Sequence, residues 1–180
     1  MIVGTLLFLY TVNCGINYYA SSFSSYAGLA DGTYTVEELE TLCSDLVELV
    51  NESAKSGRQS YREHRSVWRA EAVTAMQAAG EQFSCLGGFY PKPKEVLVSR
   101  ILSVQQLCGV YSPFTVEANY NGDMPDYNVP HTLCHELSHL KGFMREDEAN
   151  FIGYLACTSS EDRSFRYSGH FWLFHLISYK

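Results

Sequence analysis

Two histidines and a glutamate in the segment His135-Glu136-Leu137-Ser138-His139 form an H-E-x-x-H pattern within a predicted helix. Because residues four apart lie on one face of a helix, both imidazoles can bind the same metal ion. Two histidine ligands leave room for a third protein ligand and a water, as in a catalytic zinc site. Glu136 is turned towards the open position, where it can accept a proton from that water. The competing interpretation is a surface helix with two solvated histidines.

The third ligand is expected in the acidic run after Gly142, because a glycine there ends the helix and turns the chain back over the metal. Glu146 and Glu148 compete for this role, and their side chains point about 200° apart on a helix. Glu146 is preferred because Asn150, one turn later, can hydrogen-bond a ligating histidine, whereas Glu148 has Ile152 in that position. For either acid the alternative is a favourable place in a first helical turn.

Other polar residues are candidates for catalytic roles. Tyr167 and His170 carry donors of the kind that stabilise the oxyanion of a tetrahedral intermediate, although Tyr167 fits a core aromatic equally well. His131 lies one turn before His135, but the start of a helix favours capping or solvent contact. Glu117 lies in a predicted strand, where it either orients a substrate or faces water.

The metal helix is expected from about Pro130 to Lys141, with Asn128 as the capping residue. A capping box of Thr35 and Glu38 starts an earlier helix that ends near Ser56-Gly57. Apolar spacing predicts further helices at about 66–82, 145–158 and 168–179.

Residues 110–120 are the best strand candidate, and Pro113 favours an edge position, where an extended substrate can pair with the strand. Residues 96–107 fit a strand, a short helix or one after the other, because the spacing of their apolar residues does not distinguish between these structures.

The chain has 180 residues, of which 46% are hydrophobic and 18% charged, which fits one folded domain. A formal charge of -7 argues against nucleic acid as a partner. Six scattered cysteines without a C-x-x-C pair favour buried thiols over disulfides. We therefore predict an α+β, zincin-like domain over residues 13–180, mostly helical, with a small sheet and the H-E-x-x-H helix.

Residues 1–12, MIVGTLLFLYTV, are either the stump of a membrane anchor or a buried N-terminal segment. They are too few to span a bilayer, and they lack the basic start and cleavage site of a signal peptide. No Lys or Arg precedes Lys55, whereas cytoplasmic flanks of membrane helices are rich in these residues. The anchor interpretation therefore places a membrane-associated domain outside the cytoplasm.

The segment PHTLCHELSHLKGFMREDEANFIGYLAC resembles the signature of a bacterial membrane-anchored family, catalogued only as a domain of unknown function and regarded as zinc metallopeptidases. The resemblance extends to NYY, YPKPKEVLVSRIL, SPFTVEAN and RYSG, so it covers most of the chain. It implies membrane anchoring through segments N-terminal to this chain.

More distantly, E-D-E-A-N resembles the E-x-x-A-D element of zincins with a glutamate third ligand, which implies Glu146 as the ligand and Asn150 as its supporting residue. Two departures leave the ligand open. The spacing from His139 to Glu146 is shorter than in those zincins. Gly142 instead matches the H-E-x-x-H-x-x-G of metzincins, whose third ligand would fall on Arg145, and arginine does not bind zinc.

The sequence thus predicts a peptidase that binds one Zn²⁺ and hydrolyses a peptide or protein substrate. The alternative is a non-catalytic zinc-binding sensor or interaction module at the membrane, in which the metal stabilises the fold. A helical domain without metal is a second alternative. Imidazole and carboxylate ligands also accept other divalent ions, so zinc rests on the helical motif.

Overall fold

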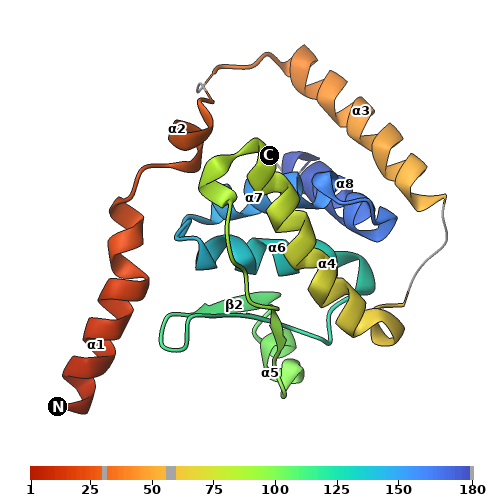
Figure 1. The fold of residues 1–180 in the computed structure, drawn as a ribbon. Helices are drawn as coiled ribbons and strands as arrows, with labels where there is room; N and C mark the ends of the chain where they lie inside the picture. The colour runs from red at the N-terminus through yellow and green to blue at the C-terminus, as the bar shows by residue number, and fades with distance from the viewer. Residues whose placement is uncertain (30–31, 56–59, 179–180) are drawn as a thin grey trace.

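The computed structural model describes residues 1–29, 32–55 and 60–178 (Figure 1). It is mostly helical with one three-stranded sheet, in agreement with the predicted α+β class. At its centre lies α6 (Val129–Leu140), which contacts α4 (Tyr61–Gln82), α7 (Glu146–Ser159), α8 (Arg163–Ser178) and the sheet. The helix that carries the H-E-x-x-H pattern is therefore the core helix of the molecule.

Burial of α6 explains why it holds its position. Ten of its residues are buried, including His131, Glu136 and His139. A surface helix with solvated histidines is therefore the wrong interpretation. Gly142, with φ +98°, ends the helical segment in the left-handed region, as the sequence predicted.

The start of α6 differs from the expected cap. Asn128 occupies the capping position, but its side chain makes no capping hydrogen bond. Instead, the Oγ of Ser168 on α8 accepts a hydrogen bond from the backbone N–H of His131 (3.1 Å) and donates one to the carbonyl of Tyr127 (2.5 Å). A residue from a distant helix thus caps α6.

The sheet has the order β1 (Lys94–Glu95), β3 (Glu117–Tyr120), β2 (Gly109–Ser112). β1 pairs with β3 in parallel, and β2 pairs with β3 antiparallel in the register Gly109↔Tyr120 to Ser112↔Glu117. The single strand expected over 110–120 is therefore a hairpin, broken after Ser112 where Pro113 lacks an N–H. β2 lies at an edge of the described sheet, as Pro113 indicated.

The remaining long helices largely follow the predicted periodicity. The capping box of α3 (Val36–Ala54) is confirmed: Thr35 N donates to Glu38 Oε2 (2.8 Å) and Glu38 N to Thr35 Oγ1 (3.2 Å). Its predicted end at 56–57 lies outside the described residues, and the helix ends at Ala54. α4 starts at Tyr61, before the predicted residue 66, and α8 starts at Arg163, before the predicted residue 168, while Tyr179 lies outside the described residues.

Short elements connect these helices: η1 (Gly15–Tyr19), α2 (Phe23–Ala27), η2 (Ser84–Leu86), α5 (Ser99–Val104) and η3 (Asp126–Asn128). Phe23 of α2 is buried and makes edge contacts with Phe83, Phe143 and Phe151. This aromatic contact fixes the loop between α6 and α7 on the helical core.

The first helix, α1 (Ile2–Asn13), projects from the rest of the molecule (Figure 1). None of its residues is buried in this structure. Among the described residues, no helix has the length and apolar character needed to cross a bilayer. All six cysteines lie in the described ranges and are free.

Candidate metal centre

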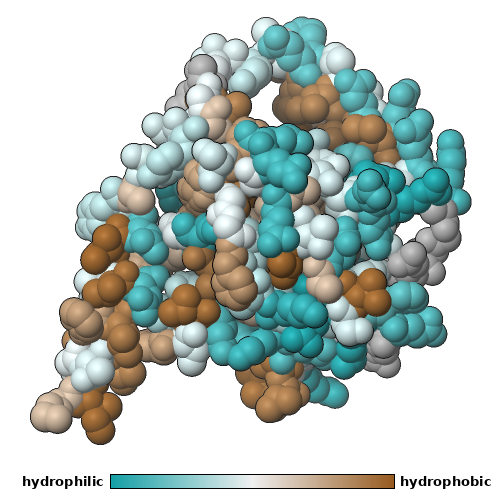
Figure 2. All heavy atoms as spheres, viewed as in Figure 1, coloured by the Kyte–Doolittle hydropathy of each residue, from teal (hydrophilic) through white to brown (hydrophobic). Residues whose placement is uncertain are grey.

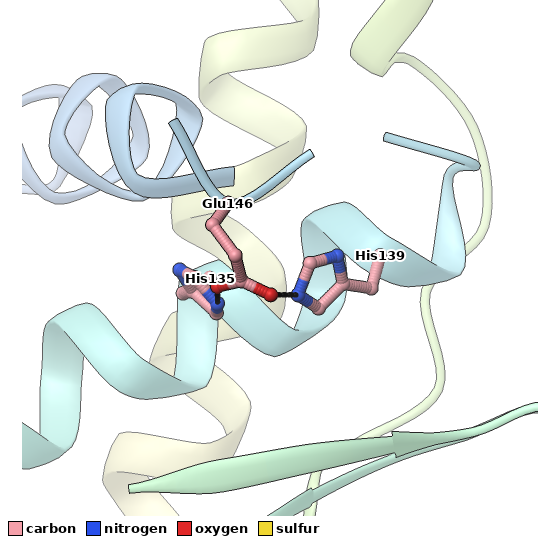
Figure 3. A group of neighbouring side chains, drawn as sticks. All are labelled: His135, His139 and Glu146. Atoms are coloured by element: carbon pink, nitrogen blue, oxygen red, sulfur yellow. Dashed lines mark ion pairs between the residues drawn. The ribbon is translucent and has the colours of Figure 1, made fainter. Parts of the chain in front are cut away.

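The side chains of His135, His139 and Glu146 meet at the junction of α6 and α7 (Figure 3). His135 Nε2 lies 3.2 Å from Glu146 Oε2, and His139 Nε2 lies 3.6 Å from Glu146 Oε1. One ligand atom from each residue can be chosen so that all lie within 4.8 Å of one another. Of the two glutamates that the sequence proposed, the structure brings Glu146 to the histidines.

The turn between α6 and α7 explains this convergence. After Gly142, the N–H of Phe143 bonds to the carbonyl of Ser138 (3.3 Å), and the Phe143 ring packs on Phe23. The chain therefore reverses within a few residues, and Glu146 becomes the first residue of α7, directly above the histidine face of α6.

Hydrogen bonds orient both imidazoles. His139 Nδ1 lies 2.7 Å from the carbonyl oxygen of Phe143, so its N–H donates there and leaves the Nε2 lone pair facing Glu146. The side chain of Asn150 lies close enough to His135 to help raise the pKa of this histidine. Such outer contacts are typical of histidines that bind metals.

Burial and the neighbouring charged groups shift the pKa values of the three side chains of the cluster. Burial opposes a charge on His135, yet the hydrogen bond with Glu146 and the nearby carboxylates raise its pKa. Burial and repulsion from His135 lower the pKa of His139. The hydrogen bond with His135 lowers the pKa of Glu146. Glu146 thus favours positive charge at His135, whereas His139 favours its neutral form, in which an imidazole nitrogen can bind a cation.

Glu136 is buried beside the cluster without a partner for one oxygen. Its side chain lines the same pocket, the residue is 4% exposed, and its Oε2 makes no hydrogen bond within the described chain. Burial raises its pKa to about 8; the charge of His135 opposes this shift, and repulsion from Glu146 adds to it. A Cβ at Gly109 of β2 would lie 2.7 Å from the carboxyl carbon of Glu136, so a larger residue there would force this carboxylate to move.

The donor set fits a zinc ion. Zinc bonds of about 2.0–2.1 Å to nitrogen and oxygen place neighbouring ligand atoms of a tetrahedral site roughly 3.3 Å apart. The two nitrogen-to-oxygen separations, 3.2 Å to Oε2 and 3.6 Å to Oε1 of Glu146, are close to this value, and one ligand atom from each residue lies within 4.8 Å of the others. The Glu146 side chain is 75% exposed, so the outer side of the cluster is open to solvent.

A pocket of about 470 Å³ lies in front of the cluster. Strand β2 forms one wall through Gly109, Val110 and Tyr111, and η1 contributes Tyr18. The cavity thus places the three candidate ligands, Glu136 and the edge strand around one space.

Three predicted site residues lie elsewhere. Glu148 Oε1 accepts a hydrogen bond from the backbone N–H of Phe23 (3.0 Å) and is not in the cluster. Tyr167 stacks on Phe171, and His170 is buried with its Nδ1 3.3 Å from Ser53 Oγ. Neither residue lines the pocket, so the structure does not bring the two predicted oxyanion donors to the cluster.

Two aromatic residues of the pocket were not identified from the sequence. Tyr18 lines the pocket near Glu146, and burial together with Cys14, Tyr10 and Glu146 raises its pKa. Trp172 stacks on His131, with 4.3 Å between ring centroids, and also lines the pocket. The only sequence signal for Tyr18 was the NYY run of the resemblance, which gave no link to residue 146.

His131 supports the centre and is not one of its ligands. It is buried, its Nε2 lies 3.1 Å from the carbonyl oxygen of Asn150, and burial lowers its pKa to about 3. A neutral imidazole that donates to this carbonyl ties α6 to α7 beside the cluster.

Comparison with known proteins gives one match. A family model described as "Protein of unknown function (DUF3810)" matches residues 1–179. No curated protein and no solved structure matches the chain.

Proposed function

Since the chain belongs to the DUF3810 family, whose description names no activity, we propose from the site itself that the protein is a zinc-dependent metallopeptidase with a zincin-like fold. The observation that carries the proposal is the meeting of His135, His139 and Glu146 beside the buried carboxylate of Glu136, whose Oε2 has no hydrogen-bond partner among the described residues. A structural carboxylate at this depth would normally be paired. A free one beside a cation site is what a general base requires.

The residues divide the chemistry as follows. A zinc ion on the three ligands would supply Lewis-acid activation of a water molecule and of the peptide carbonyl. Glu136 accepts a proton from the attacking water while the oxygen of this water bonds to the carbonyl carbon. The same carboxyl group then donates this proton to the amine nitrogen as the C–N bond breaks. Burial of Glu136 raises its affinity for a proton, which suits both steps.

The walls of the pocket favour an extended peptide. Strand β2 is an edge strand and lines the pocket, so its backbone can pair with a substrate strand. The hydroxyl of Tyr18 is available to donate a hydrogen bond to the carbonyl oxygen as negative charge develops there. Among the described residues that line the pocket there is no Lys or Arg, so a terminal carboxylate has no cation to bind. This supports cleavage at internal bonds.

The test combines metal analysis with Glu136→Gln. We expect about one zinc per chain in both wild type and variant, because Glu136 is not a ligand, and a fall of about 10²–10⁴ in the rate of peptide cleavage. Glu148→Gln is the matched control, with normal activity. Undiminished cleavage by Glu136→Gln would contradict the mechanism. Bound zinc without cleavage of any peptide would instead favour the non-catalytic zinc-binding module.

A further inference from the structure

Two stretches of this acidic chain contain almost no charged side chains. Residues 1–30 contain no Asp, Glu, Lys, Arg or His, and residues 96–116 contain one charged residue, Arg100. The chain as a whole has 20 acidic and 13 basic residues. All acidic side chains therefore lie outside these two stretches.

The fold joins the two stretches. Asn13 Nδ2 donates a hydrogen bond to the carbonyl of Pro113 (2.7 Å), and the Tyr111 hydroxyl donates one to the carbonyl of Asn13 (3.1 Å). We call residues 1–19 and 96–116 together the uncharged face. The end of α1 and the residues around Pro113 are thus neighbours, and the two segments contribute a single charged side chain of their own.

The uncharged face exposes large apolar side chains. Leu97 is fully exposed, Val104 is 79% exposed, and only Leu102 of α5 is buried. Figure 2 shows hydrophobic residues along α1 and again where α5 lies. More than half of the exposed large hydrophobic residues of the described chain belong to this face: Met1, Ile2, Val3, Leu6, Leu7, Phe8, Tyr10, Val12, Ile16, Tyr18, Tyr19, Leu97, Val98, Ile101, Val104, Leu107, Val110, Phe114 and Val116.

Scattered apolar side chains are normal on protein surfaces, but a gathered set without charge marks a binding surface. We propose that the uncharged face docks on the surface of an anionic lipid bilayer, with the apolar residues of α5 entering the interface beside α1. Lipid fits better than a protein partner because neither segment carries an acidic side chain of its own, the one cation, Arg100, is exposed, and exposed tyrosines lie among the apolar residues. The acidic group that adjoins α5 is Asp123, which accepts a hydrogen bond from Ser103 (3.2 Å).

Docking fixes where the pocket faces. Tyr18 from one stretch and Leu107 and Val110 from the other line the pocket with the candidate metal ligands. The docked protein therefore holds its pocket beside the lipid headgroups. On the proposed peptidase function, this identifies the substrate class as polypeptides held at the membrane surface.

Vesicle partitioning of the full chain tests the docking face. Leu6→Ser, Leu7→Ser and Phe8→Ser together reduce the contribution of α1, and in this background Leu97→Ser, Ile101→Ser and Val104→Ser are added. We expect the added changes to lower co-sedimentation with phosphatidylcholine–phosphatidylglycerol vesicles about ten-fold or more. The matched control adds Val36→Ser, Leu42→Ser and Val67→Ser, which change exposed apolar residues outside the face and leave binding unaltered.

A second experiment tests the contribution of the Arg100 charge to vesicle binding. Arg100→Gln is expected to weaken binding about five-fold on the mixed vesicles and not on phosphatidylcholine alone. Equal partitioning of the α5 variant and its control would overturn the proposal. So would concentration-dependent self-association without lipid that the α5 changes abolish, because a second copy would then be the occupant.

The substrate class is tested separately. We expect the α5 changes to slow cleavage of a vesicle-anchored peptide and to leave cleavage of the same soluble peptide unchanged. Equal slowing of both would contradict the assignment of substrate class. Absence of cleavage by wild type would contradict the peptidase proposal, whereas the partition measurements need no substrate and judge the docking face alone.

Discussion

Glu136 and its surroundings say most about the chemistry of the centre. An unpaired buried polar atom costs about 1–3 kcal/mol, more when it is charged, so a chain keeps one only where another function requires it. The absence of a side chain at Gly109 makes room for this carboxylate. The neighbouring acid Glu146, in contrast, is engaged by both histidines. Two adjacent glutamates therefore have different surroundings and different proposed roles.

The two glutamates of α7 give a matched pair of variants. Glu146→Gln is expected to lower zinc affinity at least about ten-fold, because a neutral amide replaces the only anionic ligand of the centre. Glu148→Gln is expected to retain zinc and to lose about 1 kcal/mol of unfolding free energy, since it weakens the bond to Phe23 N. Zinc titration and denaturant unfolding measure both effects. Equal zinc loss in the two variants would argue against Glu146 as the ligand.

Tyr18 lines the pocket, and we propose for it the donor role that the sequence assigned to Tyr167 and His170. Tyr18→Phe is expected to lower kcat by about 10²–10³ with little change in KM or zinc content, since the hydroxyl acts on charge that forms in the transition state. Tyr167→Phe serves as the control with unchanged kcat, because this residue does not line the pocket. Steady-state kinetics on a soluble peptide makes the comparison, and a drop in Tyr167→Phe of the same size would contradict the assignment.

At the scale of the element, the sequence predicted what local rules govern. The capping box of α3, the glycine end of α6 and the first turn of α7 depend on residues close in sequence, and all three are present. The orientation of α8 depends on tertiary packing and was not predictable. His170 and Trp172 lie about 200° apart on this helix, and Trp172, not His170, faces the pocket.

The cap of α6 shows the same limit, because Ser168 is 37 residues from His131 in the sequence and no local pattern links them. Ser168→Ala is expected to reduce the unfolding free energy by about 1–2 kcal/mol, since it removes a buried cap with two hydrogen bonds. Asn128→Ala is expected to change it by less than about 0.5 kcal/mol, because its side chain makes no capping bond. Denaturant unfolding of both variants compares a distant cap with a local one.

At the scale of the whole molecule, the candidate centre joins two core helices. α6 supplies His135 and His139, and α7 supplies Glu146, so a bound cation links helices that also pack against α4 and α8. Sequence spacing predicted that His135 and His139 lie on the same face of α6, because residues four apart are separated by about one helical turn. It left the third ligand between Glu146 and Glu148, because that choice depends on how the turn at Gly142 directs α7.

Metal binding should therefore stabilise the entire fold. At free zinc of about a thousand times Kd, the gain is about 4 kcal/mol, which corresponds to a rise in Tm of roughly 8–16 °C for a chain of this size. Thermal unfolding with added zinc or with a chelator measures this shift. Glu146→Gln is expected to show a much smaller shift, while Glu148→Gln keeps it, because only Glu146 joins the histidines. An equal shift in wild type and Glu146→Gln would mean that zinc binds elsewhere, and then the link between α6 and α7 would not be the source of stability.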